Sequence, residues 1–370
     1  MYNNNIRLLI IVTTKFELDG ITNNIMNYYK YMDKSDMKVD FAVPNIVPDR
    51  LKNIIKANDG TIFELPYRNN NPIKYLINLK RIISKNNYNI VHAHGNSSTL
   101  ALEMYAAKSA GINIRIAHSR NTMCKYKTIN KVLRPIFDRN TTHGFACGVD
   151  AGKWLFRNNE FKVIKNGNDI EKFKPNQKVR RQVREKYDLQ GKKVIGHVGH
   201  FNYQKNHEFL IEVFNELVRI NPNTILFLIG DGKLRPFIKE KVEKMGLMDK
   251  VVFIGKSLEV EKLIQAMDVM VLPSRYEGLP NVSIEWQIAC IPSVFSDGIT
   301  KEIAITDLVH FMSLESGALE WAKLLDQIEL VDRNEVSDRV VKQITDAGFN
   351  IEENSKELKK IYTNLLTEIK

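Results

Sequence analysis

Two glutamates flank a turn in the carboxyl-terminal half of the chain, eight positions apart. They belong to the segment Pro273-Ser-Arg-Tyr-Glu277-Gly278-Leu279-Pro280-Asn281-Val-Ser-Ile-Glu285, which follows a short apolar run. If that run is a buried strand and a helix begins after the turn, free backbone N–H groups there can bind phosphates. Gly278 lets a ligand approach the backbone closely, and carboxylates accept hydrogen bonds from hydroxyl groups. The pattern predicts a site for a phosphorylated ligand rich in hydroxyls; two surface glutamates beside an ordinary turn are the alternative.

Two histidines stand close together in Val91-His-Ala-His94, at the end of another apolar run. Alternate residues of a strand point to the same side, so His92 and His94 are expected to face the same way. This spacing also suits a metal ion, but no third ligand stands nearby in the sequence, and we expect no metal. His92 is expected to be a packed or hydrogen-bonded core residue.

The elements that must position these residues repeat one pattern, an apolar run, a turn and a segment of helical period. Ile6 to Val12 is typical of a buried parallel strand, and helical spacing follows Asp19-Gly20. Further strands are expected at Val39 to Val43, Thr61 to Leu65, Ile90 to Ala93, Ile114 to Ala117, Gly144 to Cys147 and Lys162 to Ile164. Helical patterns lie between most of them, which indicates a doubly wound α/β layer.

The same pattern starts again after Asn166-Gly167 and a polar segment, Phe173 to Lys186, which we interpret as an interdomain linker. Its strands are expected at Val194 to Val198, Thr224 to Ile229, Val251 to Ile254, Val269 to Leu272 and Pro292 to Phe295. We therefore expect an α/β protein with two Rossmann-like domains, residues 1–172 and 173–346, facing a central cleft. A last helix in residues 347–370 has an apolar stripe that we expect to return to the first domain.

Composition sets the broad class of protein. The chain has 370 residues, 44% hydrophobic and 26% charged, which suits two globular domains. No run approaches the roughly 18 apolar residues of a membrane span or forms a secretory signal, so a cytoplasmic protein is expected. The three cysteines are far apart and predict neither disulfides nor a zinc site. The net charge of +11 favours a membrane surface or phosphates over nucleic acid, since no nucleic-acid motif accompanies it.

Together these segments resemble glycosyltransferase family 4, a large family of retaining enzymes with the GT-B fold. The two glutamates match its Glu-x7-Glu motif, and the resemblance extends over nearly the whole chain. The other matching pieces are Val91-His-Ala-His94, Ala117-His118-Ser119, Lys165-Asn-Gly167, Gly196-His-Val-Gly199-His200, Lys205-Asn206-His207 and Gly230-Asp-Gly232. The likeness is closest to bacterial transferases that assemble capsular or exopolysaccharide repeat units.

The resemblance implies roles for individual residues. Glu285 would hold the ribose hydroxyls of a nucleotide-sugar donor, with a UDP-sugar favoured, while Glu277 and His94 would lie near the donor sugar. The donor would also contact the turn residues Gly278, Leu279, Pro280 and Asn281, together with Gly199, His200 and Gly20. Attack would occur at the front face, with the donor phosphate helping to deprotonate the acceptor hydroxyl.

Lys205 is expected to neutralise the diphosphate as it leaves, because negative charge concentrates there in the transition state. The sequence contains no Asp-x-Asp triplet of the kind that holds a metal in other transferases, so no metal cofactor is expected. The family usually has Arg where His200 stands, and a His is only partly protonated near neutral pH. The clamp on the diphosphate would then depend more heavily on Lys205.

A basic, partly apolar segment extends from Arg120 to Arg139. The lysines Lys125, Lys127 and Lys131 would suit an anionic membrane and a lipid diphosphate acceptor, and His118 and Arg120 could contact that acceptor. An ordinary surface helix packed on its sheet is the alternative. The protein would then be peripheral on the inner face of the plasma membrane.

Three functions fit these expectations. The first is transfer of a hexosyl or similar residue from a nucleotide sugar to a saccharide acceptor, expected to be lipid-linked. The second is a sugar-nucleotide 2-epimerase of the same architecture, which would isomerise the donor without an acceptor. The third is a non-catalytic protein that binds a nucleotide sugar. Replacement of Glu285 or Lys205 separates the enzymes from the binding protein, because only an enzyme loses turnover.

Overall fold

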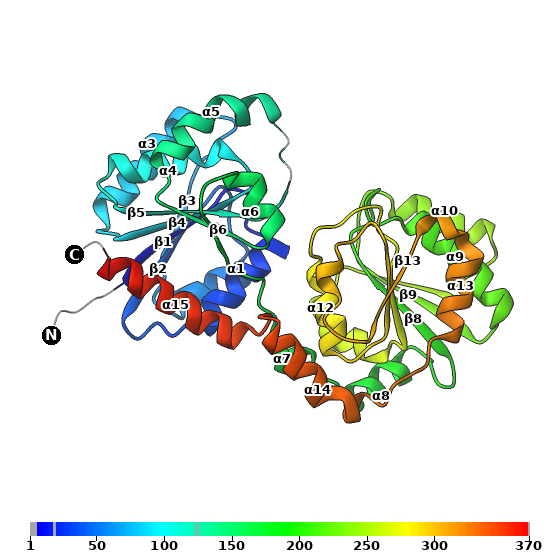
Figure 1. Ribbon diagram of the computed structural model, residues 1–370. Coiled ribbons are helices and arrows are strands. Elements are labelled where there is room, and N and C mark those ends of the chain that lie inside the picture. The colour runs from blue at the N-terminus through cyan, green and yellow to red at the C-terminus, as the bar shows by residue number, and fades with distance from the viewer. Residues whose placement is uncertain (1–5, 18–19, 123, 125, 369–370) are drawn as a thin grey trace. The chain divides into compact units, whose positions relative to one another are not determined.

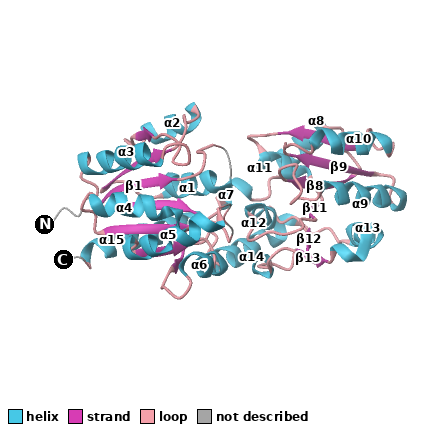
Figure 2. Cartoon of the chain, turned by 90° about the horizontal axis from the view of Figure 1, so that it is seen from above, coloured by secondary structure: helices cyan, strands magenta, loops and turns pink. Residues whose placement is uncertain are grey.

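Two parallel β-sheets form the framework of the chain (Figure 1). The computed structural model describes residues 6–17, 20–122, 124 and 126–368. The chain divides into two units, the first made of Met1–Gly167 and Ile351–Lys370 and the second of Asn168–Asn350. In both units helices flank the strands (Figure 2), as expected for parallel sheets that are buried on both faces.

Among the described residues, seven parallel strands form the first sheet in the order β3-β2-β1-β4-β5-β6-β7. They are β1 (Ile6–Val12), β2 (Met37–Val43), β3 (Ile62–Glu64), β4 (Ile90–Gly95), β5 (Ile114–Ser119), β6 (His143–Ala146) and β7 (Lys162–Val163). The helices of this unit are α1 (Gly20–Tyr31), α2 (Asp49–Lys56), α3 (Pro72–Lys85), α4 (Ala101–Ser109), α5 (Lys127–Asn140), α6 (Val149–Phe156) and α15 (Ile351–Thr367).

Alternating side chains of the central strand β1 pack into two separate hydrophobic cores. Leu8 and Ile10 pack with residues of α1, α2 and α15 on one face of the sheet. Leu9 and Ile11 pack with residues of α3, α4, α5 and α6 on the other face. Because both faces are covered, the strand is continuously apolar from Leu8 to Val12 rather than alternating apolar and polar.

The second sheet has six described strands in the order β10-β9-β8-β11-β12-β13. They are β8 (Lys193–Val198), β9 (Thr224–Ile229), β10 (Val251–Gly255), β11 (Val269–Leu272), β12 (Ser293–Ser296) and β13 (Val309–Met312). The helices are α7 (Ile170–Phe173), α8 (Gln177–Lys186), α9 (His207–Ile220), α10 (Arg235–Lys244), α11 (Val260–Leu263), α12 (Asn281–Ile288), α13 (Gly317–Gln327) and α14 (Arg333–Asp346).

The last helix, α15, belongs to the first unit although it follows the second in sequence. Its residues Leu358, Ile361 and Tyr362 are buried in the core beneath β1 and α1. Lys359 adds two ion pairs of 2.6 Å, to Asp33 and Asp36 at the end of α1. The apolar stripe of this helix is therefore buried on the first sheet.

Two sequence-based expectations are wrong in detail. Most of the segment expected to be a linker is the helix α8, because Arg180 and Arg184 lie one turn apart and both pair with Asp268. Strand β13 was not expected, since its residues are only half-buried and lack a clear apolar run. The two units are divided after Gly167 and after Asn350. None of the described helices has both the length and the apolar character needed to cross a bilayer.

Candidate functional site

The turn with the two glutamates joins β11 to α12 in the second unit, as the sequence pattern predicts. Glu277 is held by its backbone, which donates to the carbonyl of Gly298 at 3.1 Å, and by Ser274, whose hydroxyl donates to Oε1 at 3.1 Å. Pro280 precedes the first residue of α12, so Gly278, Leu279, Pro280 and Asn281 together form the entry to this helix. The first N–H groups of a helix, together with its dipole, favour an anion at such a position.

Lys205 and Glu277 lie together at this turn. Their side chains form an ion pair of 2.7 Å, and both are largely buried, with 14% and 10% of the side-chain surface exposed. The two loops that hold them are also linked by two hydrogen bonds. The N–H of Arg275 donates to the carbonyl of Gln204 at 2.8 Å, and the side-chain amide of Gln204 donates to the carbonyl of Tyr276 at 3.1 Å. A buried, positioned ammonium beside a helix entry can stabilise charge that develops on a diphosphate.

Glu285 lies within α12 and is half-buried. Burial raises the pKa of its carboxyl to about 7, and the charge of Lys172 opposes this effect. No side chain among the described residues forms a hydrogen bond or ion pair with this carboxylate. An unpaired, partly buried carboxylate is available to accept hydrogen bonds from a ligand diol.

Glycines allow the loops around Lys205 to pack closely. A Cβ on Gly199, which follows β8, would lie 2.7 Å from Nε2 of His197, and one on Gly230 would lie 2.0 Å from the carbonyl oxygen of Gly199. Gly230 also has a φ of +144°, which disfavours other residues. A side chain at Gly199 or Gly230 would therefore clash with its neighbours in the loops beside the Lys205–Glu277 ion pair.

The histidines near Lys205 differ in exposure. His200 is exposed, whereas His197 and His207 are buried. Burial, together with the charge of Lys205, lowers the pKa of His197 to about 3 and that of His207 to about 2. Both buried rings are therefore neutral near pH 7, and Lys205 supplies the fixed positive charge. Neither His197 nor His207 is a predicted site residue, because both lie inside the matched segments but have no distinctive spacing of their own.

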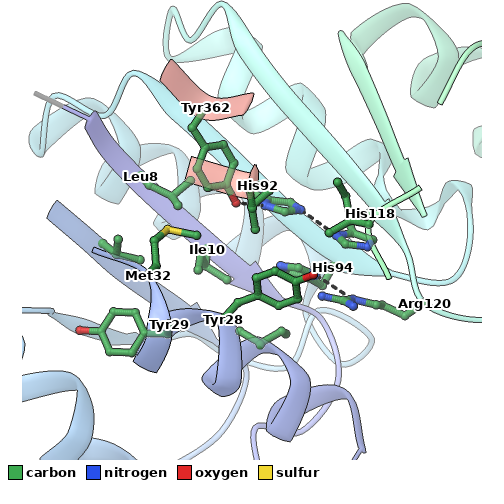
Figure 3. A pocket seen from close by; sticks show the side chains of 14 residues that line it. Leu8, Ile10, Tyr28, Tyr29, Met32, His92, His94, His118, Arg120 and Tyr362 are labelled. Atoms are coloured by element: carbon green, nitrogen blue, oxygen red, sulfur yellow. Dashed lines mark hydrogen bonds between the residues drawn. The ribbon is translucent and has the colours of Figure 1, made fainter. Parts of the chain in front are cut away.

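A second group of polar residues lies in the first unit, where β4 and β5 end. His92 and His94 do face the same side, and His118 of β5 is paired with His94 across the two strands. The ring of His92 lies between Tyr362 and His118. Its Nδ1 is 2.7 Å from the hydroxyl of Tyr362, and its Nε2 is 3.0 Å from Nδ1 of His118. Arg120 donates from Nε to Nδ1 of His94 at 3.0 Å (Figure 3). We call His92, His94, His118 and Arg120 the histidine cluster.

The histidine cluster lines a small cavity of about 20 Å³, which is otherwise mostly apolar. Burial is the main reason that the pKa values of His92, His94 and His118 lie well below 6.5, and the charge of Arg120 lowers them further. All three rings are therefore neutral. The tyrosine hydroxyl of Tyr362 comes from α15, so the C-terminal helix completes this group.

The structure supplies a third histidine that the sequence spacing did not reveal. One ring nitrogen each of His92, His94 and His118 lies within 4.8 Å of the others, which is the geometry of a metal site. However, the guanidinium of Arg120 donates to His94, so Nδ1 of His94 is occupied and Nε2 bears the proton. The positive charge of Arg120, in contact with His94, would also repel a metal ion bound to the three histidines. The donor set does not fit a metal ion in this arrangement.

The remaining predicted residues are spread over the first unit. His118 is buried and Arg120 is half-buried, and both belong to the histidine cluster. Lys127 and Lys131 are exposed on α5, whereas Lys125 lies outside the described residues. Gly20 is the exposed first residue of α1, and Asp19 lies outside the described residues.

Comparisons with known proteins agree with this geometry. The family described as "Glycosyl transferases group 1" matches residues 179–340. The putative glycosyltransferase EpsF of Bacillus subtilis is 30% identical over 381 residues, which cover 99% of this chain and 98% of that protein. An Escherichia coli protein, UDP-Gal:alpha-D-GlcNAc-diphosphoundecaprenol alpha-1,3-galactosyltransferase, is 28% identical over 249 residues, 61% of this chain and 62% of that protein.

Solved structures of low sequence identity share the fold. A glycosyltransferase from Rickettsia africae superposes with a TM-score of 0.79 at 15% identity, covering 98% of this chain and 99% of that one. Anabaena HepE in complex with UDP-glucose gives a TM-score of 0.76 at 15% identity, covering 96% and 99%. These likenesses and the two parallel sheets confirm the expected GT-B fold with two Rossmann-like domains.

Proposed function

Because this chain belongs to the glycosyl transferases group 1 family, we propose that it moves a hexosyl residue from a UDP-sugar to a lipid-linked saccharide. We propose further that the transfer needs no metal and retains the configuration at the anomeric carbon, as in glycosyltransferase family 4. Relatives that take part in polysaccharide biosynthesis support a role in making a bacterial surface polysaccharide.

The observation that supports the donor site most directly is the 2.7 Å ion pair between Lys205 and Glu277 beside the entry to α12. A UDP-sugar presents a ribose diol, a diphosphate and a sugar in that order. Glu285 would accept from the diol, the helix entry and Lys205 would bind the diphosphate, and Glu277 would meet the sugar. Binding of UDP and UDP-glucose by HepE, which has the same fold, favours this donor class.

Metal independence follows from the positive charge of Lys205 in this proposal. Cleavage of the sugar–phosphate bond leaves negative charge on UDP, and a fixed ammonium with free helical N–H groups stabilises that charge in the transition state. Front-face attack, with a donor phosphate oxygen accepting the proton of the acceptor hydroxyl, would form the new glycosidic bond with retention. Lys205 would then hold UDP as the leaving group.

The acceptor class is supported by the E. coli relative, whose name specifies a sugar carried on diphosphoundecaprenol. In this chain, α5 exposes Lys127 and Lys131 beside Val132 and Ile136, a combination suited to an anionic membrane surface. A peripheral position on the inner face of the plasma membrane would bring the protein to such an acceptor.

A panel of nucleotide sugars tests the proposal. Each is mixed with the protein, and thermal stabilisation is measured, because a ligand bound to the folded state raises its apparent stability. The stabilising donor is then offered to lipid-diphosphate saccharides without and with EDTA. We expect UDP release that depends on the acceptor and survives EDTA, and a product whose anomeric configuration, read by NMR, matches that of the donor.

A variant of Lys205 and its control test the catalytic role of this residue, and the reaction products separate a transferase from its alternatives. Lys205→Met is expected to lower kcat by about 10²- to 10³-fold through loss of transition-state stabilisation. Lys178→Met removes an exposed lysine of α8 in the same unit and serves as the matched control. Isomerisation of the donor without an acceptor would instead indicate a 2-epimerase, and donor binding with no turnover would indicate a binding protein.

A further inference from the structure

Arg120 is held at three points around the end of β4. Its Nε donates to Nδ1 of His94 at 3.0 Å, while Nη1 donates to Asn24 of α1 at 2.7 Å and to Asn166 at 3.2 Å. The two asparagines accept through their side-chain oxygens, so the guanidinium plane cannot turn without breaking these bonds. Figure 3 shows Arg120 approaching the ring of His94 at the edge of the cavity.

This contact determines which nitrogen of His94 bears a proton. A guanidinium has only donors and stays protonated in proteins, so Nδ1 of His94 must be the acceptor. A neutral imidazole that accepts at Nδ1 has its proton on Nε2. His94 is therefore a hydrogen-bond donor at Nε2, and it has no free lone pair with which to accept a proton.

The surroundings keep His94 in this form. The groups that face it are His92 on the same strand, His118 and Arg120 from β5 and its end, Tyr28 from α1 and Tyr362 from α15. No carboxylate of the described residues lines the cavity, so nothing stabilises an imidazolium. Burial lowers the pKa of His94 well below 6.5, and His92 and Arg120 lower it further.

We propose that Arg120 is a positioning residue that fixes His94 as the Nε2–H tautomer, so that His94 presents an N–H donor to a sugar oxygen of the substrate. This inference rests on the proposed transferase function. His94 then orients the sugar and takes no part in deprotonating the acceptor hydroxyl, whose proton goes to a donor phosphate oxygen. Arg120 itself touches no substrate, and it acts only through His94.

The tautomer can be read directly by ¹⁵N NMR of histidine-labelled protein, with the His94 signals assigned from their loss in His94→Gln. For the wild type we expect one proton-free nitrogen, Nδ1, and one protonated nitrogen, Nε2, unchanged between pH 5.5 and 8.5. In Arg120→Met the proton should distribute over both nitrogens, while the ring stays neutral over this range because it remains buried. A wild-type ring protonated at Nδ1, or a spectrum unaffected by Arg120→Met, overturns the proposal.

Kinetics with the stabilising nucleotide sugar give a second readout. Arg120→Met should lower kcat by about tenfold, the usual cost of one misoriented hydrogen bond. Arg120→Lys keeps a cationic donor and should recover part of the loss, which also covers the case in which the methionine variant does not fold. Arg115→Met is the matched control, since Arg115 lies on β5 but donates only to backbone carbonyls away from His94.

The two proposals can fail separately. If the wild-type tautomer is as expected but no nucleotide sugar is turned over, the transferase function fails while the arrangement of Arg120 and His94 stands. If transfer occurs but His94 is protonated at Nδ1 or titrates near pH 6.5 in the wild type, the positioning role of Arg120 fails alone.

Discussion

At the scale of single residues, the two glutamates of the turn have different surroundings. Glu277 is paired with Lys205 at 2.7 Å and accepts from the hydroxyl of Ser274. Glu285 has no such partner among the described residues, and burial raises the pKa of its carboxyl to about 7. Burial therefore controls whether Glu285 is ionised near neutral pH.

Glu285 predicts a pH dependence of donor binding. Its carboxyl has a pKa of about 7 in the free protein because it is partly buried, and only the ionised form accepts from both ribose hydroxyls. Affinity for the donor should therefore rise with pH through about 7 and be about tenfold weaker at pH 6 than at pH 8.5. Calorimetric titration with UDP-glucose measures this, since its diphosphate, unlike that of UDP, has no ionisation in this range.

The control for this prediction is Glu285→Gln, which should bind weakly at every pH. Any dependence that remains in this variant belongs to other groups. An equally steep rise of affinity with pH in wild type and variant would contradict the role given to Glu285.

The candidate site could be predicted only in part from the sequence. Glu277, Glu285 and Lys205 stand in motifs whose spacing is visible in the chain. The contact of Arg120 with His94 depends on the register of β4 and β5 and on side-chain rotamers, which sequence spacing does not specify. The burial of His118 follows from the same packing.

At the scale of elements, the strands were largely predictable and the polar helices were not. The bounds of β1, β9 and β11 match the expected runs, because a parallel strand buried on both faces is a continuous apolar segment. Helix α8 has only Val183 buried, so its pattern resembles that of a linker. What fixes it to the sheet is Asp268, which no local pattern connects with residues 180–184.

Removal of this connection should destabilise the second unit. Asp268 pairs with Arg180 at 2.5 Å and Arg184 at 3.2 Å, and it accepts from the backbone of Val194 at 2.7 Å. Asp268→Asn leaves two largely buried guanidinium groups without a counter-charge, and we expect a loss of about 3 kcal/mol in the free energy of unfolding. Urea denaturation measures the loss. Asp188→Asn removes the exposed pair with Lys192 and should change stability by less than about 0.5 kcal/mol.

Helix α5 predicts a membrane contact that can be tested apart from catalysis. Val132 is 68% and Ile136 45% exposed, on a helix that also exposes Lys127 and Lys131. The protein should co-sediment with phosphatidylglycerol vesicles, less so at high salt, and Val132→Glu with Ile136→Glu should lower this binding by tenfold or more. Ile220→Glu introduces a charge at a similarly exposed site of the second unit and should have no effect. Equal binding of all variants would mean that another surface is responsible.

At the scale of the whole molecule, the two units contain different groups of the predicted site residues. Every predicted donor contact except His94 and Gly20 lies within Asn168–Asn350, while the histidine cluster needs Tyr362, which the chain adds only after the second unit is complete. The first unit is therefore discontinuous in sequence and the second is continuous.

This division predicts that a fragment of the second unit folds by itself and that a fragment of residues 1–167 does not. Residues 168–350 contain both cores of the second sheet and the Lys205–Glu277 pair, so this fragment should fold and bind UDP-glucose within about tenfold of the intact affinity, without transferring the sugar. Residues 1–167 lack α15, and the face that Leu358, Ile361 and Tyr362 cover would be exposed to water. That fragment should remain unfolded or aggregate until a peptide of residues 351–370 is added, as judged by circular dichroism and NMR. Cooperative folding of residues 1–167 alone would show that α15 is dispensable for the first unit, because burial of its apolar stripe would then contribute little to stability.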